Sequence, residues 1–189
     1  MNVFGGEDDA NLVPATPIHA AIPWIPYVRW PRAFSFWALT VGSMVNDLEV
    51  VPLWVLSGDI YHSRGLMHSV LGVLTLNATV AVFATLYLVP PAMRWFDRRW
   101  REPRVFRFAG RDLHEDPRDI GTVYASAALG GLTHILVDIP THAYNPVWWP
   151  WQTVPLNLVP YADELWWDIV AGIPVLLLFA WMMYAYWRR

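Results

Sequence analysis

The chain has 189 residues, of which 56% are hydrophobic and only 15% are charged, whereas a soluble domain carries about 25% charged residues. This composition indicates a membrane protein. The chain contains no cysteine, so disulfides and thiolate metal sites are excluded, and any bound metal must have nitrogen and oxygen ligands. The formal net charge is −3, and eight of the arginines lie between positions 94 and 118. We expect no nucleic-acid partner from this pattern.

The N-terminal segment is polar at first and then becomes apolar. Residues 1–15 lack the basic and apolar regions of a cleavable signal peptide, so we expect a polar tail. Residues 16–27 are apolar, but they are too few to cross a membrane and include three prolines. We therefore predict a short, half-inserted helix there. It carries His19, which by itself is consistent with a single histidine at a membrane interface.

Four longer apolar stretches follow, and each is predicted to be a transmembrane helix. Asp47 and Glu49 interrupt the first stretch, so we expect Asp47 at the end of a helix of about 14 residues. Pro90 and Pro91 are expected to end the second stretch. The third stretch is rich in small residues, which permits close helix packing. The sequence thus predicts an all-α integral membrane protein with one domain over residues 16–189. The four predicted spans are 33–56, 66–89, 120–137 and 165–187.

The arginines predict the orientation of these spans. Segment 93–119 is rich in arginine and is predicted to be an exposed loop, partly at the membrane surface, and the chain ends on Arg188 and Arg189. The positive-inside rule predicts that this loop and the C-terminus are cytoplasmic. The loops 57–65 and 139–162, which are rich in polar residues or in proline and tryptophan, then lie outside. We expect the location to be the cell (inner) membrane of a bacterium or an archaeon.

Residues 131–142 place His134 and Asp138 four positions apart at the end of an apolar run. This spacing puts both side chains on one helix face. Ionisable groups are costly in an apolar segment, so the two residues either bond to each other at a helix end or bind a metal ion. The predicted topology favours the metal, because it brings further candidate ligands to the same membrane face. These are His19, Asp47, His68 and His142.

Four motifs occur in one order along the chain: Thr-Pro-Ile-His at 16–19, Gly-Ser-Met-Val-Asn-Asp-Leu-Glu at 42–49, Ser-Arg-Gly-Leu-Met-His-Ser at 63–69, and Leu-Gly-Gly-Leu-Thr-His-Ile-Leu-Val-Asp-Ile-Pro-Thr-His at 129–142. They resemble the membrane-bound metal-dependent hydrolases of the YdjM type. That family's pattern is an early His, Pro-Asp-x-Asp, His-Arg-Gly-x-Thr-His-Ser and His-x-x-x-Asp, and it is distantly similar to zinc phospholipase C and P1 nuclease. Four positions depart from the pattern: Asn46, Glu49, Ser63 and Met67.

The resemblance implies a site that binds one to three divalent ions, with zinc as the expected metal. Asp138 would bridge the ions, and Asp47 and Asp138 would be the catalytic carboxylates. The implied reaction is hydrolysis of a phosphoester, which we expect to be lipid-linked, at the outer membrane face. The implied metal ligands are His19, Asp47, His68, His134 and Asp138, with His142 as a weaker candidate.

A hypothesis from another class is a non-catalytic subunit that keeps the hydrolase-like fold within a larger membrane protein complex. The 13 tryptophans and the serine at position 63 favour it, although tryptophan also anchors proteins at membrane interfaces. Membrane lipids are expected partners under both hypotheses.

Overall fold

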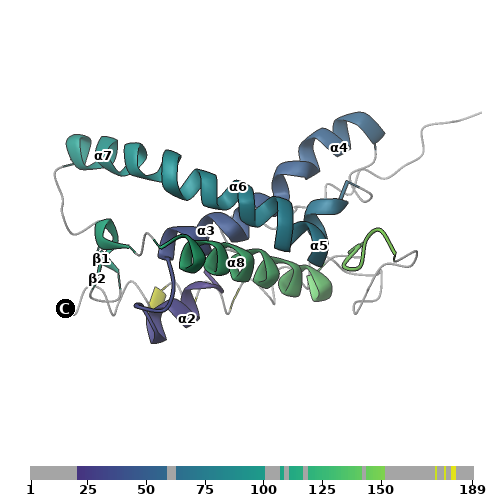
Figure 1. Ribbon diagram of the computed structural model, residues 1–189. Coiled ribbons are helices and arrows are strands. Elements are labelled where there is room, and N and C mark those ends of the chain that lie inside the picture. Colours follow the sequence, from purple (N-terminus) through teal and green to yellow (C-terminus); the bar gives the residue numbers. More distant parts are fainter. Residues whose placement is uncertain are drawn as a thin grey trace, which may run out of the picture.

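The computed structural model describes residues 21–58, 63–100, 107–108, 111–116, 119–141 and 144–151, with four single residues further on. This part of the chain is all-α apart from one small hairpin, as predicted (Figure 1). The N-terminal tail and all but four residues of the predicted fourth span lie outside the described residues. The main helices are α2 (Trp24–Arg29), α3 (Phe36–Val45), α4 (Val50–Ser57), α5 (Val70–Gly72), α6 (Ala78–Phe83), α7 (Val89–Trp100) and α8 (Ile120–Thr141).

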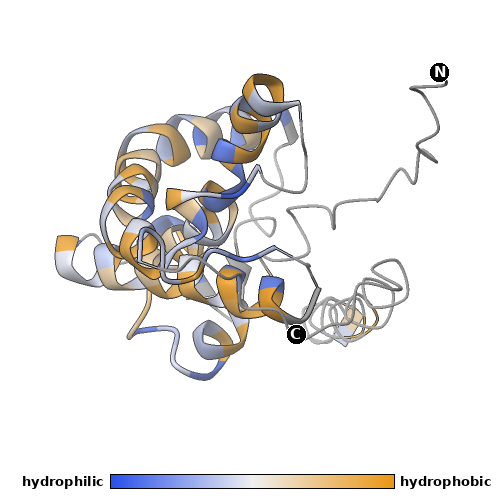
Figure 2. Cartoon of the chain, turned by 90° about the vertical axis from the view of Figure 1, so that its right-hand side faces the viewer, coloured by the Kyte–Doolittle hydropathy of each residue, from blue (hydrophilic) through white to orange (hydrophobic). Residues whose placement is uncertain are grey.

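Within the described residues, three helical runs are long and apolar enough to cross a membrane: Phe36–Ser57, Val70–Arg99 and Ile120–Ile139. We call them the first, second and third spans, and they confirm three of the predicted apolar helices. Much of the helical ribbon has the colour of hydrophobic residues (Figure 2), and large apolar side chains such as Leu74, Phe83 and Leu136 are exposed. Exposed apolar surface of this extent is expected where a helix faces lipid rather than water.

The first and third spans lie side by side and run in the same direction. At one end the backbone N–H of Ser35 donates to Ser126 Oγ at 2.9 Å, and further along Asn46 Nδ2 donates to the Gly131 carbonyl at 3.3 Å. The contact is close because glycine occupies the crossing point: a Cβ at Gly130 would overlap the backbone of the first span. The predicted role of the small residues of the third span, close helix packing, is therefore confirmed.

The first span is continuous, and its first α-helix, α3, ends at Val45, close to Asp47, where a helix end was predicted. After α3 the chain makes one turn of 3-10 helix, η1 (Asn46–Glu49), and then continues as α4 up to Gly58. The tighter turn changes the direction of the helix, so α4 points away from the other helices (Figure 1). None of the residues of α4 is buried.

The second span continues through Pro90 and Pro91, so the prediction that these prolines end it was wrong. A π-helical segment, η4 (Ala84–Leu88), comes directly before them, and the N–H of Val89 bonds to the carbonyl of Ala84, five residues earlier. Proline lacks an N–H and normally clashes with the carbonyl four residues back. The wider π turn relieves that conflict, and α7 runs on to Trp100. A second π segment, η3 (Val73–Asn77), lies earlier in the same span.

Segment 93–119 was predicted to be an exposed loop, and this too needs correction. Beyond α7 it contains the antiparallel strands β1 (Arg107–Phe108) and β2 (Arg111–Asp112) and a 3-10 turn, η6 (Leu113–Glu115). Asp116 is buried and accepts hydrogen bonds from Ser35 Oγ at 2.5 Å and from the N–H of Phe36 at 2.9 Å. This carboxylate stabilises the N-terminus of α3, where the helix dipole favours negative charge.

The short N-terminal helix also differs from its prediction. Helix α2 begins at Trp24 and reaches Arg29, later than the predicted range of 16–27, of which residues 16–20 lie outside the described part. Prolines 23 and 26 explain the start, because proline is tolerated only before or within the first turn, where backbone N–H groups have no helical partner. The third span also differs slightly from its prediction: α8 continues past Pro140 and ends at Thr141, whereas the predicted span ended at residue 137.

Candidate metal centre

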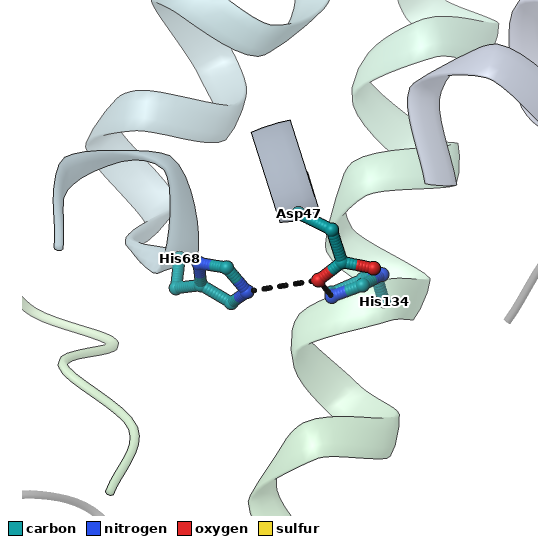
Figure 3. A group of neighbouring side chains, drawn as sticks. All are labelled: Asp47, His68 and His134. Atoms are coloured by element: carbon teal, nitrogen blue, oxygen red, sulfur yellow. Dashed lines mark ion pairs between the residues drawn. The ribbon is translucent and has the colours of Figure 1, made fainter. Parts of the chain in front are cut away.

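Asp47, His68 and His134 come together from the three spans (Figure 3). Asp47 lies in η1, His68 in the 3-10 turn η2 (Leu66–His68) that precedes α5, and His134 in α8. Asp47 Oδ1 is 3.5 Å from His68 Nε2 and 3.4 Å from His134 Nε2. Both rings are fully buried. One ligand atom from each of the three residues lies within 4.8 Å of the other two, so this group could hold a metal ion.

Asp138 joins the same group from α8, one turn after His134. Its Oδ2 is 3.3 Å from His134 Nε2 and 3.6 Å from His68 Nε2, and the carboxylate is buried. Each of the two carboxylates thus faces both imidazole rings. Four ligands at about 2.0–2.2 Å from a tetrahedral ion are separated from one another by about 3.3–3.6 Å. The four nitrogen–oxygen distances lie in this range.

The second nitrogen of each ring has its own partner. His134 Nδ1 is 2.7 Å from the carbonyl oxygen of Ser43, and His68 Nδ1 is 2.8 Å from Glu49 Oε1. Since a carbonyl or carboxylate oxygen can only accept, each Nδ1 donates a proton to it. In a neutral ring the lone pair is then on Nε2, which faces the carboxylates. Such a hydrogen bond behind the ring is typical of histidines that bind metals.

Glu49 fixes the turn that carries His68. Besides the ring nitrogen, its carboxylate accepts the backbone N–H groups of Gly65 at 2.7 Å, Met67 at 2.9 Å and His68 at 3.1 Å. The side chain therefore holds both the orientation of the ring and the backbone before α5. We did not predict this role, although the family pattern has an acidic residue at this position, which could have indicated it.

Two asparagines tie the three spans together beside the site. Asn77, in η3, donates from Nδ2 to Asn46 Oδ1 at 2.8 Å and to the Met67 carbonyl at 2.7 Å, while Asn46 donates to Gly131. Both asparagines are fully buried. Buried amides are stable only when they are hydrogen-bonded, so this network helps to fix the helices that supply the candidate ligands. It was also absent from our predictions.

Of the six predicted ligands, four are brought together by the structure: Asp47, His68, His134 and Asp138. His19 and His142 lie outside the described residues. The donor set contains two imidazole nitrogens and carboxylate oxygens, which suits zinc, manganese or ferrous iron. The two buried rings and the two carboxylates therefore suit a divalent ion in the type of donor atom and in the distances between these atoms. The hydrogen bonds of the two Nδ1 atoms also suit metal-binding histidines.

Residues 13–189 match the model of a family described as a domain of unknown function, DUF4184. No curated protein and no solved structure matches the chain. The family match covers nearly the whole sequence, including all four candidate ligands that the structure brings together and both that lie outside the described residues. The chain therefore belongs to the DUF4184 family.

Proposed function

We propose that this protein is a membrane-embedded, metal-dependent hydrolase of phosphoesters, with Asp47, His68, His134 and Asp138 as ligands of a divalent ion, zinc in the first place. The observation that carries the proposal is the pairing of both Nε2 atoms with both carboxylates while each Nδ1 is occupied by a hydrogen-bond acceptor. His19 and His142 are proposed as further ligands on the sequence pattern alone.

Electrostatics supports a cation at this position. With Nδ1 protonated, a neutral ring directs its Nε2 lone pair at carboxylate oxygens 3.3–3.6 Å away, and two electron-rich groups in a buried site repel each other. Either a proton on each ring or one divalent ion between them removes the repulsion. One divalent ion supplies the same charge as two protons, and it also accounts for the four nitrogen–oxygen distances.

The ligands determine what chemistry is available. A divalent ion held by Asp47, His68, His134 and Asp138 would bind water as a fifth ligand, as catalytic zinc can. It would lower the pKa of that water and stabilise negative charge on a phosphoryl oxygen. Asp47 is the most accessible of the four groups, since 19% of its side chain is exposed whereas the others are buried. We therefore infer that substrate approaches from the side of Asp47, while Asp138 and the two rings form the closed side of the site.

Two features support a lipid-linked substrate and an outward-facing site. Helix α4 leaves the bundle directly after Asp47 and exposes apolar side chains, among them Val55 and Leu56, so lipid can lie next to the site. Helix α5, which directly follows the turn of His68, and the C-terminal end of α8, which carries His134 and Asp138, lie at the opposite end of the helices from α7 and the strands of the arginine-rich segment (Figure 1). If that segment is cytoplasmic, as the positive-inside rule predicts, the site faces outward. The same ligand pattern supports kinship with YdjM-type hydrolases.

The proposal is tested with the full-length protein in detergent and the variants Asp138→Asn and His134→Ala. The wild type should bind zinc and hydrolyse a phosphodiester, presented either as a chromogenic ester or as phospholipid in mixed micelles. Each variant should lose zinc affinity by at least about 100-fold, more than is typical for removal of an outer hydrogen-bond partner, and should lose activity with it. Asp97→Asn, which changes only a surface pair with His114, is the control and should retain both.

The result that contradicts the proposal also identifies the alternative. A wild type that contains no metal after incubation with zinc, shows no hydrolysis and co-purifies with other membrane proteins would be a structural subunit. In that case Asp138→Asn should keep or improve the folded yield, because a neutral amide is less costly than a carboxylate near apolar surface.

A further inference from the structure

Arg64 is a buried arginine beside the candidate ligands, and the hydrolytic role proposed above does not use it. Only 8% of its side chain is exposed, and its Nε lies 3.7 Å from Asp138 Oδ2. That distance is short enough for an ion pair but too long for a hydrogen bond. Nε has no hydrogen-bond acceptor among the described residues. A guanidinium carries five N–H donors, and burying such a group without acceptors is costly.

The position of Arg64 is set by the same carboxylate that orients His68. Ser63, just before it, is fully buried, and the N–H of Gly65, just after it, donates to Glu49 Oε1. The backbone directly after Arg64 is thus held by Glu49. Because Glu49 also bonds to His68 Nδ1, one carboxylate holds both the backbone next to Arg64 and the imidazole of His68.

The Asp138 oxygen that lies nearest to Arg64 Nε also faces both histidines. The same oxygen, Oδ2, faces His134 Nε2 at 3.3 Å and His68 Nε2 at 3.6 Å, so a metal ion bound there would take up its negative charge. The Nε–H of Arg64 would then lie beside the ion without an acceptor among the described residues. An oxyanion that binds the metal through one oxygen and Arg64 through others would satisfy both.

We propose that Arg64 and the metal centre together form a binding site for the phosphoryl group of the substrate, with the guanidinium donating to its non-bridging oxygens. The planar, forked guanidinium matches tetrahedral phosphate oxygens and can donate two parallel hydrogen bonds. This inference rests on the proposed function, which it deepens by naming a phosphoryl oxyanion as the recognised part of the substrate. Both a free phosphoester and a lipid headgroup carry that oxyanion.

The test compares the wild type with Arg64→Gln, Arg64→Lys and the control Arg98→Gln, which removes an exposed arginine of α7. For each full-length protein in detergent, zinc affinity is measured by competition with a chromophoric chelator. Binding of inorganic phosphate is measured by calorimetry, with and without added zinc. Phosphatidic acid in the micelles is titrated in parallel.

Arg64→Gln should keep zinc affinity within about threefold and weaken phosphate binding by about 10- to 100-fold, because charge-assisted hydrogen bonds are lost. Arg64→Lys should lie between this variant and the wild type, since lysine keeps the charge but not the fork. The Arg98→Gln control should bind zinc and phosphate as tightly as the wild type does. If Arg64→Gln weakens phosphatidic acid as well, the site accepts lipid headgroups; if only inorganic phosphate is weakened, it accepts free phosphoesters.

Three results would overturn the inference: a wild type that binds no phosphate with or without zinc, unchanged phosphate affinity in Arg64→Gln, or zinc affinity that falls in step with phosphate affinity. The last would make Arg64 a charge partner of Asp138 only. If Arg64→Gln does not fold, wild-type phosphate affinity in Arg64→Lys overturns the bidentate arrangement. A wild type that binds zinc and phosphate through Arg64 without hydrolysing any ester contradicts the hydrolase and leaves the binding site intact.

Discussion

Glu49 holds the turn that carries His68, although it is not one of the candidate ligands. It joins the first span to the start of the second through four hydrogen bonds. Such bonds fix the tautomer and the orientation of a metal-binding histidine. The geometry of the site at His68 therefore depends on a residue two positions after Asp47.

We expect Glu49→Gln to weaken zinc binding by about 10- to 100-fold, as is typical when the hydrogen-bond partner of a metal-binding histidine is removed. The amide keeps the volume of the side chain, but its NH2 group must face one of the N–H donors that the carboxylate accepts. Chelator competition measures the affinity, and Asp97→Asn is the matched surface control. Unchanged zinc affinity in Glu49→Gln would contradict this role.

For single residues, the sequence predicted the candidate metal ligands but not the residues that form hydrogen bonds or ion pairs with them. The i, i+4 spacing of His134 and Asp138, together with the helix order, was enough to expect Asp47 and His68 beside them. The family pattern has an acidic residue at position 49, but the hydrogen-bond partners of Glu49 and the contact of Arg64 with Asp138 depend on the 3-10 turn of η1 and on the backbone at 63–65. Neither feature has a periodic signal in the sequence. The assignments of His19 and His142 stay predictions.

Helices α3 and α8 cross in close contact at Gly130. The distance between the two helices at this crossing determines where His134 lies. A Cβ at Gly130 would overlap the Leu39 carbonyl and approach the Ser43 backbone nitrogen to 3.0 Å. The Ser43 carbonyl is the acceptor for His134 Nδ1. A change in the spacing of these two helices is therefore expected to move the ring as well as to strain the packing.

We expect Gly130→Ala to destabilise the protein by about 1–3 kcal/mol, as overpacking typically does, and to weaken zinc binding in parallel. Gly121→Ala, in the first turn of the same helix, is the matched control because the only atom within contact range of its Cβ, Asp119 Oδ1, is at 3.5 Å. Alanine there should be neutral or slightly stabilising. Thermal unfolding in detergent compares the two, and equal stability would contradict the close crossing.

The existence of the apolar spans could be predicted from the hydrophobic stretches of the sequence, but the positions of their ends could not. Prolines 90 and 91 were expected to stop the second span. The π turn of η4 comes before them, and the helix continues although proline has no N–H to donate. The 3-10 turn of η1 similarly keeps the first span continuous past Asp47 and Glu49. Both turns are local changes in hydrogen bonding, which hydrophobic patterns do not encode.

At the scale of the whole molecule, the proposed orientation places the candidate site and the arginine-rich segment on opposite sides of the membrane. The antiparallel second span and the parallel first and third spans separate these two regions (Figure 1). An outward-facing site next to apolar α4 would have access to lipid headgroups of the outer leaflet. The orientation itself rests on the positive-inside rule.

Because the chain has no cysteine, single-cysteine labelling gives a clean test of the orientation. Trp148→Cys, at an exposed position near the site end, should react with a membrane-impermeant maleimide in intact cells. Arg104→Cys should react only after the membrane is opened. External labelling of position 104 together with protection of position 148 would reverse the proposed orientation.

The binding of a divalent ion by Asp47, His68, His134 and Asp138 is the claim on which the proposed function depends. Its most direct test is the zinc content of the purified full-length protein after incubation with zinc and removal of free ions, combined with zinc-edge X-ray absorption. We expect at least one zinc per chain, with nitrogen and oxygen ligands at about 2.0–2.2 Å, and a loss of that zinc in His134→Ala. A wild type without zinc, or a His134→Ala variant with the same zinc and the same absorption spectrum, would contradict the metal centre.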